Sequence, residues 1–223
     1  MNGQLPDCIL FDLDGTLVDS LPGIEFSVGE AFSQCNLPLA KKGLRELIGP
    51  PIRTILSRAG DVLEEGTLNA LEHAFRVSYD AEGWRKTTCF PDVNGVLRMM
   101  HERGHRLFVL SNKPRHASLQ ILEREGILQY FDLVLTRDSR SPKYAGKEEM
   151  IGALLAERGI IEKDCVMVGD TAEDAKAAAA AGIKYIQMTH GYGAAGQLSA
   201  LPVALTIDSF SQFLPLINEG VFL

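Results

Sequence analysis

The sequence predicts an α/β protein, with a parallel β-sheet covered by helices on both faces and a second, helical domain inserted into it. Short apolar runs alternate with segments of helical period, which is typical of a parallel sheet. Most of the apolar runs are continuous, as expected for strands buried on both faces. The region from about Leu21 to about Lys86 contains no convincing strand and is too long for a strand-to-helix loop.

The sheet domain follows from the order of these segments. The predicted strands are Cys8–Phe11, Leu107–Leu110, Leu133–Leu135, Cys165–Val168, Tyr185–Met188 and Val203–Ile207. The predicted helices between and after them are Val93–Arg103, Arg115–Glu125, Glu148–Arg158, Thr171–Ala181 and Ser209–Ile217. Glycines stand where a left-handed residue commonly ends a helix, at Gly104, Gly126, Gly159 and Gly182.

The insert is predicted to be helical throughout. Its helical segments are Ile24–Gln34, Lys41–Ile48, Pro51–Ala59 and Thr67–Ala81, separated by Gly and Pro. We therefore expect residues 1–18 and 88–223 to form the sheet domain, and residues 19–87 to form the inserted domain. Asp19–Ser20 and Thr87–Pro91 are the expected hinge segments between the two domains.

The charge and the apolar pattern exclude several classes of partner. The formal net charge of -7 argues against nucleic acid and membrane surfaces, because both usually require a basic face. A small anion in a local positive pocket is compatible with this charge. We expect a cytoplasmic protein, because no apolar run is long enough to span a membrane and the first residues do not resemble a signal peptide. The cysteines are expected to be reduced thiols, at Cys8, Cys35, Cys89 and Cys165.

Asp12 and Asp14 follow the first predicted strand, at the end where sites form in parallel sheets. Residues i and i+2 of an extended chain face the same side, so both carboxylates can point into one site. Two like charges at the mouth of a buried strand cost free energy. Asp and Gly are common turn residues, so a turn would explain Asp14-Gly15. A turn does not explain the second carboxylate, at Asp12.

Ser111 and Asn112 follow the second predicted strand. A hydroxyl group and nearby backbone N–H groups can donate hydrogen bonds to an anion. The alternative interpretation is an N-cap for the helix that starts near Pro114.

Asp170 and Asp174 stand four residues apart at the start of a predicted helix, so they share a face. An acidic first turn, stabilised by the helix dipole, is the alternative interpretation. If the strands are neighbours, however, Asp170 converges with Asp12 and Asp14. Converging carboxylates require a cation, and hard oxygen ligands suit Mg²⁺.

Three motifs resemble those of the haloacid dehalogenase superfamily, in its phosphoglycolate phosphatase and β-phosphoglucomutase branch. They are DLDGTLVDS at 12–20, LFVLSN at 107–112 and VGDTAED at 168–174. The resemblance extends over nearly the whole chain. It implies a Rossmann-like three-layer core, with the insert forming a mobile α-helical cap of the C1 type.

The family also uses a lysine, and the segment SPKYAGKEEMI (141–151) offers Lys143 and Lys147. Relatives in this branch usually show Lys-Pro-x-Pro, which is absent here. Lys147 is favoured because it leads directly into the predicted helix, although either residue alone could be a surface lysine.

The resemblance assigns a role to each candidate. Asp12 is expected to be the nucleophile that forms an aspartyl-phosphate, and Asp14 the general acid and base. An acid at position 14 favours phosphate esters over halides, because an alkoxide leaving group needs a proton. The implied Mg²⁺ site consists of Asp12, the backbone carbonyl of Asp14, Asp170 and, as a ligand or an orienting group, Asp174. The residues expected to hold the phosphoryl oxygens are Ser111, Asn112 and Lys147.

The cap is expected to choose the substrate. Arg53 or Arg45 could meet a second anionic group on it, although surface arginines are an equal alternative. The predicted substrate is a small phosphorylated metabolite, such as phosphoglycolate or a sugar or nucleotide phosphate. A phosphomutase and a phospho-aspartate signalling module remain alternatives. The sequence does not distinguish a monomer from a homodimer.

Overall fold

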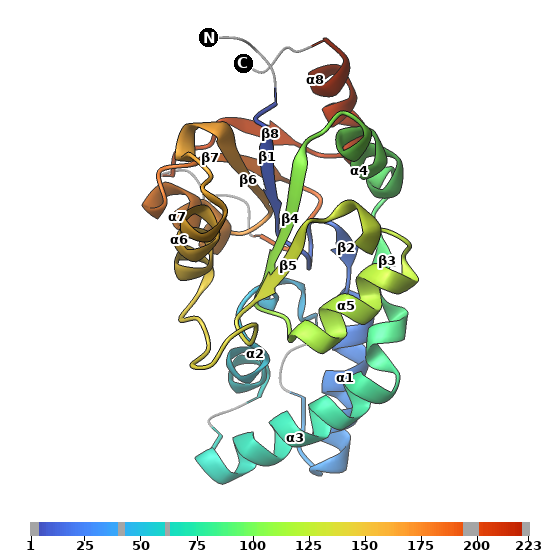
Figure 1. Cartoon of the computed structure of the whole chain (residues 1–223). Helices are drawn as coiled ribbons and strands as arrows, with labels where there is room; N and C mark the ends of the chain where they lie inside the picture. The colour runs from blue at the N-terminus through green and yellow to red at the C-terminus, as the bar shows by residue number, and fades with distance from the viewer. Residues whose placement is uncertain (1–4, 40–42, 61–62, 194–200, 220–223) are drawn as a thin grey trace.

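The computed structural model describes residues 5–39, 43–60, 63–193 and 201–219, and a parallel sheet lies at the centre of its larger part (Figure 1). Every neighbouring pair of strands in this sheet is parallel. Across the sheet the order is β5 (Leu133–Thr136), β4 (Arg106–Ser111), β1 (Cys8–Phe11), β6 (Cys165–Gly169), β7 (Lys184–Met188) and β8 (Leu205–Ile207). The predicted α/β class is confirmed.

Helices cover both faces of the sheet, which explains the continuous apolar runs. On one face, α4 (Val93–Glu102), α5 (Arg115–Arg124) and α8 (Phe213–Glu219) pack over a core that includes Ile9 and Phe11. On the other face, α6 (Lys147–Arg158) and α7 (Ala172–Ala180) pack over Cys8 and Leu10. Successive residues of β1 thus enter opposite apolar layers, so no position of the strand is polar.

β1 lies between β4 and β6, and this order brings three strand ends together. Phe11 pairs with Val109 of β4 on one side and with Val168 of β6 on the other. The residues that follow these strands therefore emerge side by side at one edge of the sheet. The polar residues predicted at the strand ends are neighbours for this reason.

The helical insert leaves and rejoins the sheet domain through a short antiparallel pair, β2 (Val18–Asp19) and β3 (Thr88–Cys89). The predicted domain boundaries, 18/19 and 87/88, fall at this pair. The elements between the two strands are α1 (Leu21–Gln34), η1 (Arg45–Leu47), α2 (Ile52–Ala59), α3 (Glu65–Ala81) and η2 (Gly83–Lys86). The insert has an apolar core of its own, in which Phe32, Leu56 and Leu71 are buried.

Two predicted helices differ from the structure. Lys41–Ile48 is not an α-helix: residues 41–42 lie outside the described residues, Gly43 has a φ of 87°, and only the short 3₁₀ turn η1 follows. A left-handed residue interrupts helical backbone, which accounts for this difference. The predicted helix Ser209–Ile217 is divided into a 3₁₀ turn, η5 (Phe210–Gln212), and α8.

Smaller expectations agree with the structure. Positive φ angles end the predicted helices at Gly104, Gly126, Gly159 and Gly182. All four cysteines are free thiols. None of the helices in the described part of the chain is both long and apolar enough to cross a bilayer.

Candidate active site

The turn after β1 places Asp12 and Asp14 at the central edge of the sheet. The amide of Asp12 still donates to the carbonyl of Val168, at 2.9 Å, so Asp12 continues the strand geometry. Gly15 then reverses the chain with a φ of 87°. A Cβ at Gly15 would lie 2.4 Å from Oδ2 of Asp170, so only glycine permits this close approach. The predicted turn and the predicted site are therefore parts of the same structure.

Asp12, Asp170 and Asp174 form a buried carboxylate cluster. One oxygen atom from each lies within 4.8 Å of the others. Burial raises the pKa of Asp12 well above its ordinary value, against the lowering effect of Lys147, and the charges of Asp174 and Asp170 raise it further. Burial and the charge of Asp174 raise the pKa of Asp170 to about 7. These carboxylates repel one another in a space that contains little solvent.

Lys147 offsets only part of this negative charge. It is 4% exposed, and its Nζ lies 2.6 Å from Oδ1 of Asp12 and 2.5 Å from Oδ1 of Asp174. Burial lowers the pKa of Lys147, but the two carboxylates more than reverse this and raise it above its usual value. Three carboxylates facing one ammonium group, with oxygen atoms as the available donors, fit a hard divalent cation such as Mg²⁺. The other candidate, Lys143, is exposed at the rim of the active-site cavity.

Asp174 is held at both of its oxygen atoms. Oδ1 accepts from Lys147, and Oδ2 accepts from the amide of Thr171 at 3.0 Å and from its hydroxyl at 2.6 Å. Thr171 and Asp174 thereby form a capping box at the start of α7. Asp174 therefore belongs both to the acidic start of α7 and to the site. The N-terminus of α7 holds its carboxylate in place, and the carboxylate in turn orients Lys147.

Ser111 ends β4 next to β1 and is 1% exposed. Asn112 points toward the cap: its Nδ2 donates to the carbonyl of Gly49 at 3.2 Å and to Oε1 of Glu173 at 2.9 Å. Neither residue caps α5. Instead, the amide of Arg115 donates to Asp138, at 3.0 and 3.3 Å from its two oxygen atoms.

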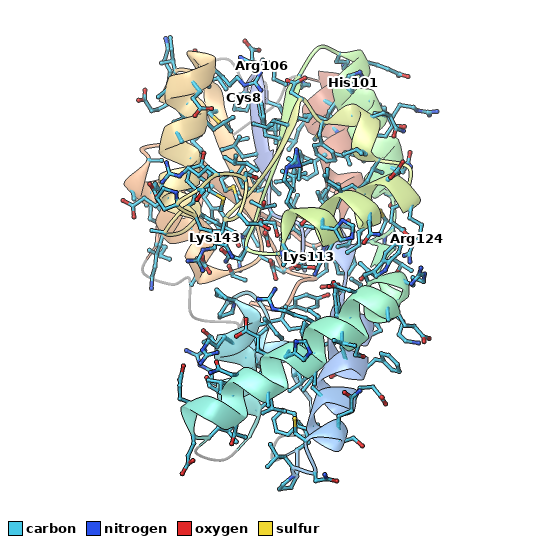
Figure 2. The ribbon with its side chains drawn as sticks, turned by 60° about the horizontal axis from the view of Figure 1, so that its bottom comes forward. Cys8, His101, Arg106, Lys113, Arg124 and Lys143 are labelled. Atoms are coloured by element: carbon cyan, nitrogen blue, oxygen red, sulfur yellow. The ribbon has the colours of Figure 1, made fainter. Side chains whose placement is uncertain are left out.

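Lys113 is a site residue that the sequence reasoning missed. It is 8% exposed, and its Nζ lies 2.9 and 3.1 Å from the two carboxylate oxygens of Asp14. Burial lowers the pKa of Lys113, but the charge of Asp14 outweighs it and raises the pKa above its ordinary value. The sequence signal was its position two residues after Ser111, at the same strand end. Figure 2 shows Lys113 at the end of the sheet domain that faces the cap helices.

A loop after β7 connects the carboxylate cluster to the hinge. The amides of Tyr192 and Gly193 donate to Oδ2 of Asp170 at 2.6 and 3.3 Å. The hydroxyl of Tyr192 donates to Oδ1 of Asp19 at 2.7 Å and accepts from the amide of Ser20 at 2.7 Å. The two predicted hinge residues are thus tied to the residue that holds Asp170.

The two cap arginines have contacts other than the expected substrate contacts. Arg45 lies outside the lining of the active-site cavity, and its Nη2 donates to the carbonyls of His190 and Gly191, at 2.7 and 2.6 Å. These bonds fasten the cap to the loop after β7, and the expected contact between Arg45 and the substrate stays a prediction. Arg53 does line the cavity, but its guanidinium group binds Glu65, Asn69 and Glu72.

A cavity of about 370 Å³ lies between the two domains. Its core side contains Asp12, Asp14, Ser111, Asn112 and Lys113. Its cap side is formed by α1, α2, α3 and the residues before α2. The predicted nucleophile and the predicted acid therefore face a cavity of a size that is usual for small ligands.

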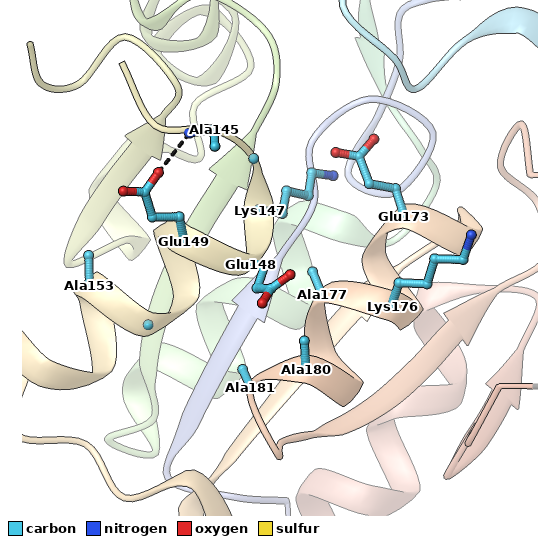
Figure 3. A pocket seen from close by; sticks show the side chains of 12 residues that line it. Ala145, Lys147, Glu148, Glu149, Ala153, Glu173, Lys176, Ala177, Ala180 and Ala181 are labelled. Atoms are coloured by element: carbon cyan, nitrogen blue, oxygen red, sulfur yellow. Dashed lines mark hydrogen bonds between the residues drawn. The ribbon is translucent and has the colours of Figure 1, made fainter. Parts of the chain in front are cut away.

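A second, wider depression lies between α6 and α7 and is lined mainly by small side chains (Figure 3). Lys147 and Glu173 border it at one end. The amine of Lys147 binds Asp12, and one carboxylate oxygen of Glu173 is bound by Asn112, so the polar atoms of both residues contact residues that line the first cavity.

Comparisons with known proteins agree with this arrangement. A family model described as haloacid dehalogenase-like hydrolase matches residues 9–188. The tyrosine-protein kinase PtkA of Mycobacterium tuberculosis is 32% identical over 218 residues, which cover 95% of this chain and 74% of the relative. A phosphoglycolate phosphatase of Nitrosococcus oceani is 27% identical over 222 residues, which cover 96% of this chain and 98% of the relative.

Solved structures give the same picture. The structure of Mycobacterium tuberculosis PtkA superposes with a TM-score of 0.81 at 31% identity, covering 96% of this chain and 99% of that one. A predicted phosphoglycolate phosphatase from Haemophilus somnus superposes with a TM-score of 0.80 at 26% identity, covering 96% and 98%.

Proposed function

We propose that this chain, which belongs to the haloacid dehalogenase-like hydrolase family, hydrolyses a small phosphorylated metabolite with Mg²⁺. The chain is an enzyme of the phosphoric monoester hydrolase type. In the proposed reaction Asp12 is phosphorylated as an intermediate. The main support is the separation of two neighbouring carboxylates. Asp12 lies in the buried cluster beside Lys147, whereas Asp14 is paired with Lys113. Two carboxyl groups in different environments can take different roles.

In the proposed reaction, a carboxylate oxygen of Asp12 attacks phosphorus as the bond to the leaving-group oxygen breaks. Asp14 gives its proton to that oxygen and then takes a proton from the water that attacks the aspartyl-phosphate. This second step releases phosphate, restores the carboxylate of Asp12 and returns the proton to Asp14. Lys147 and Ser111 bind phosphoryl oxygens, where the transition state carries charge. Asp12, Asp170 and the carbonyl of Asp14 would hold Mg²⁺, which would supply positive charge to offset the repulsion between nucleophile and phosphate.

A second candidate is phosphoryl transfer to an acceptor other than water. The identity with the tyrosine-protein kinase PtkA favours a tyrosine acceptor, and a phosphomutase would use a sugar hydroxyl. Both would require an acceptor that competes with water at the phosphorus of Asp12. A receiver-like signalling module would require neither Asp14 nor the helical insert.

Phosphate release and phosphoryl transfer can be measured on the same preparation. We expect phosphate to be released from a panel of phosphorylated metabolites and from p-nitrophenyl phosphate with Mg²⁺, but not with EDTA. Asp12→Asn should lower the rate by about a thousandfold or more. Asp132→Asn is the matched control, because Asp132 is an exposed carboxylate at the opposite end of β5.

An unchanged rate in Asp12→Asn would refute the role of Asp12. Labelled phosphotyrosine formed from ATP on a tyrosine polymer, without release of phosphate, would favour the second candidate. We further propose a cytoplasmic monomer or homodimer without a nucleic-acid or membrane partner, supported by the net charge of -7 and the four free thiols. Light scattering after size exclusion determines the oligomeric state.

A further inference from the structure

The cap side of the active-site cavity is mainly apolar. Ile24, Ile48, Ile52, Ile55 and Phe75 contribute to it from α1, α2, α3 and the residue that follows η1. Apolar walls bind apolar surface of a ligand and exclude water from it. In the proposed reaction the phosphoryl group must reach Asp12 at the core side, which leaves the cap side for the leaving group.

The cap arginines in this wall are already paired with acids. Both oxygen atoms of Glu72 are engaged, with Oε2 at 2.9 Å from Nη1 of Arg53 and Oε1 at 2.6 Å from Nη2 of Arg76. The hydrogen bond from Arg76 and the contact with Arg53 lower the pKa of Glu72 despite its partial burial. Arg53 also binds Glu65 at 2.5 Å. A carboxylate on the leaving group would therefore have to displace Glu72.

Other charges around the cavity do not change this balance at the cap. Asp80 of α3 adds a negative charge to the wall. Arg137 and Lys143 line the cavity from the core loop after β5, together with Asp138. Among the described cap residues that line the cavity, the charges are balanced. The cations are Arg53 and Arg76, and the acids are Glu72 and Asp80. The wall provides no excess positive charge for an anionic leaving group.

Tyr79 is the polar exception in the apolar wall. It is 5% exposed, and its hydroxyl makes no hydrogen bond of regular geometry with the described residues, although it lies close enough to Lys113 to help raise the pKa of that lysine. Its ring stacks on Phe75, with centroids 5.3 Å apart and an interplanar angle of 16°. Nζ of Lys113, which binds Asp14, lies 4.9 Å from the centroid of the Tyr79 ring. A buried hydroxyl without a partner costs about 1–3 kcal/mol, and a ligand that pairs with it removes this cost.

We propose that this cap selects phosphate monoesters of uncharged alcohols that have an apolar or aromatic body and a polar group in contact with the hydroxyl of Tyr79. Tyr79 is then a specificity-determining residue. Carboxylated leaving groups such as glycolate are disfavoured by the same wall. The inference rests on the phosphatase function proposed above and adds the class of its substrate.

Three synthetic monoesters separate charge from shape: benzyl phosphate, 4-carbamoylbenzyl phosphate and 4-carboxybenzyl phosphate. The amide and the carboxylate have nearly the same size, and all three leaving groups are benzylic alcohols. With Mg²⁺ we expect kcat/KM to be about tenfold or more higher for the amide than for the carboxylate, the effect of a charge without a partner. Tyr79→Phe should lower kcat/KM for the amide about tenfold more than it lowers kcat/KM for benzyl phosphate.

Tyr130→Phe is the matched control, because its hydroxyl donates to Asn94 at 3.2 Å outside the cavity. The melting temperature of Tyr79→Phe should equal or exceed that of the parent, since the substitution removes an unpaired buried hydroxyl. A carboxylate ester that is hydrolysed as well as the amide ester would overturn the proposal, as would an equal loss for all three esters in Tyr79→Phe.

The proposed function and this inference fail in different ways. Hydrolysis of phosphoglycolate but of none of the three benzyl esters refutes the inference and leaves the phosphatase intact. No release of phosphate from any monoester, with Asp12→Asn indistinguishable from the parent, refutes the function itself.

Discussion

Raising the pH in the absence of divalent cations should destabilise this protein, because Asp170 must lose a proton inside a buried carboxylate cluster. Burial and the charge of Asp174 raise the pKa of Asp170 from 3.8 to about 7. In the unfolded chain the residue ionises near its ordinary value. Between these two pKa values the folded state binds more protons than the unfolded state. The free energy of unfolding therefore falls as the pH rises through the folded pKa.

The size of the effect follows from this difference in proton binding. Between a pH of about 5 and a pH of about 8, Asp170 alone should lower the free energy of unfolding by about 2–3 kcal/mol, at about 1.4 kcal/mol per pKa unit. For a domain protein of this length, that corresponds to a decrease of about 5–10 °C in the melting temperature. The pKa of Asp12 is raised as well, so its ionisation acts in the same direction.

Calorimetry or circular dichroism in EDTA over this pH range measures the decrease. Asp170→Asn removes one of the titrating groups and keeps an oxygen acceptor for the amide of Tyr192, so it should show a smaller decrease. Saturating Mg²⁺ should also reduce the decrease, because a cation that binds only the folded, ionised cluster stabilises it. The reasoning fails if the melting temperature in EDTA is constant or rises, or if Asp170→Asn shows the full decrease.

Three further substitutions test individual contacts. Gly15→Ala should cost about 1–3 kcal/mol in urea unfolding and abolish activity, because of the positive φ and the 2.4 Å approach to Asp170; a fully active, equally stable variant would contradict this. Thr171→Val should lower the free energy of unfolding by about 1 kcal/mol through loss of the capping box with Asp174, and an unchanged urea midpoint would count against that contact. Arg45→Ala should raise KM by about tenfold, a cost of about 1.4 kcal/mol, because it removes two hydrogen bonds from the cap to the loop after β7. Steady-state kinetics measure this, and equal KM values for parent and variant would exclude a fastening role for Arg45.

The sheet could be predicted well because its information is local. Cys8–Phe11 is apolar at every position, and the structure buries every position of that strand. Gly104 and Gly159 mark helix ends by their own backbone preference, which does not depend on distant contacts. The prediction of a helix over Lys41–Ile48 was wrong, because the helical pattern of that segment carried no information about the left-handed backbone at Gly43.

The site was predictable as far as strand order determines it. Asp12, Ser111 and Asp170 lie at the ends of three adjacent strands, so their proximity is a property of the sheet. Lys113 could not be assigned a partner, because its contact with Asp14 depends on how two separate chain turns project their side chains. Arg45 could not be assigned either, since its acceptors lie in the other domain, far away in sequence.

Tyr192 makes the position of the cap and the geometry of the carboxylate cluster interdependent. Its amide holds Asp170 and its hydroxyl holds the first residues of the hinge, Asp19 and Ser20. One aromatic residue thus connects the hinge of the cap to the carboxylate cluster. Any rotation of the cap that moves the hinge must either break the bonds of the hydroxyl or shift the carboxylate of Asp170. While these hydrogen bonds persist, a change at the hinge is therefore felt at the carboxylate of Asp170, and the reverse also holds.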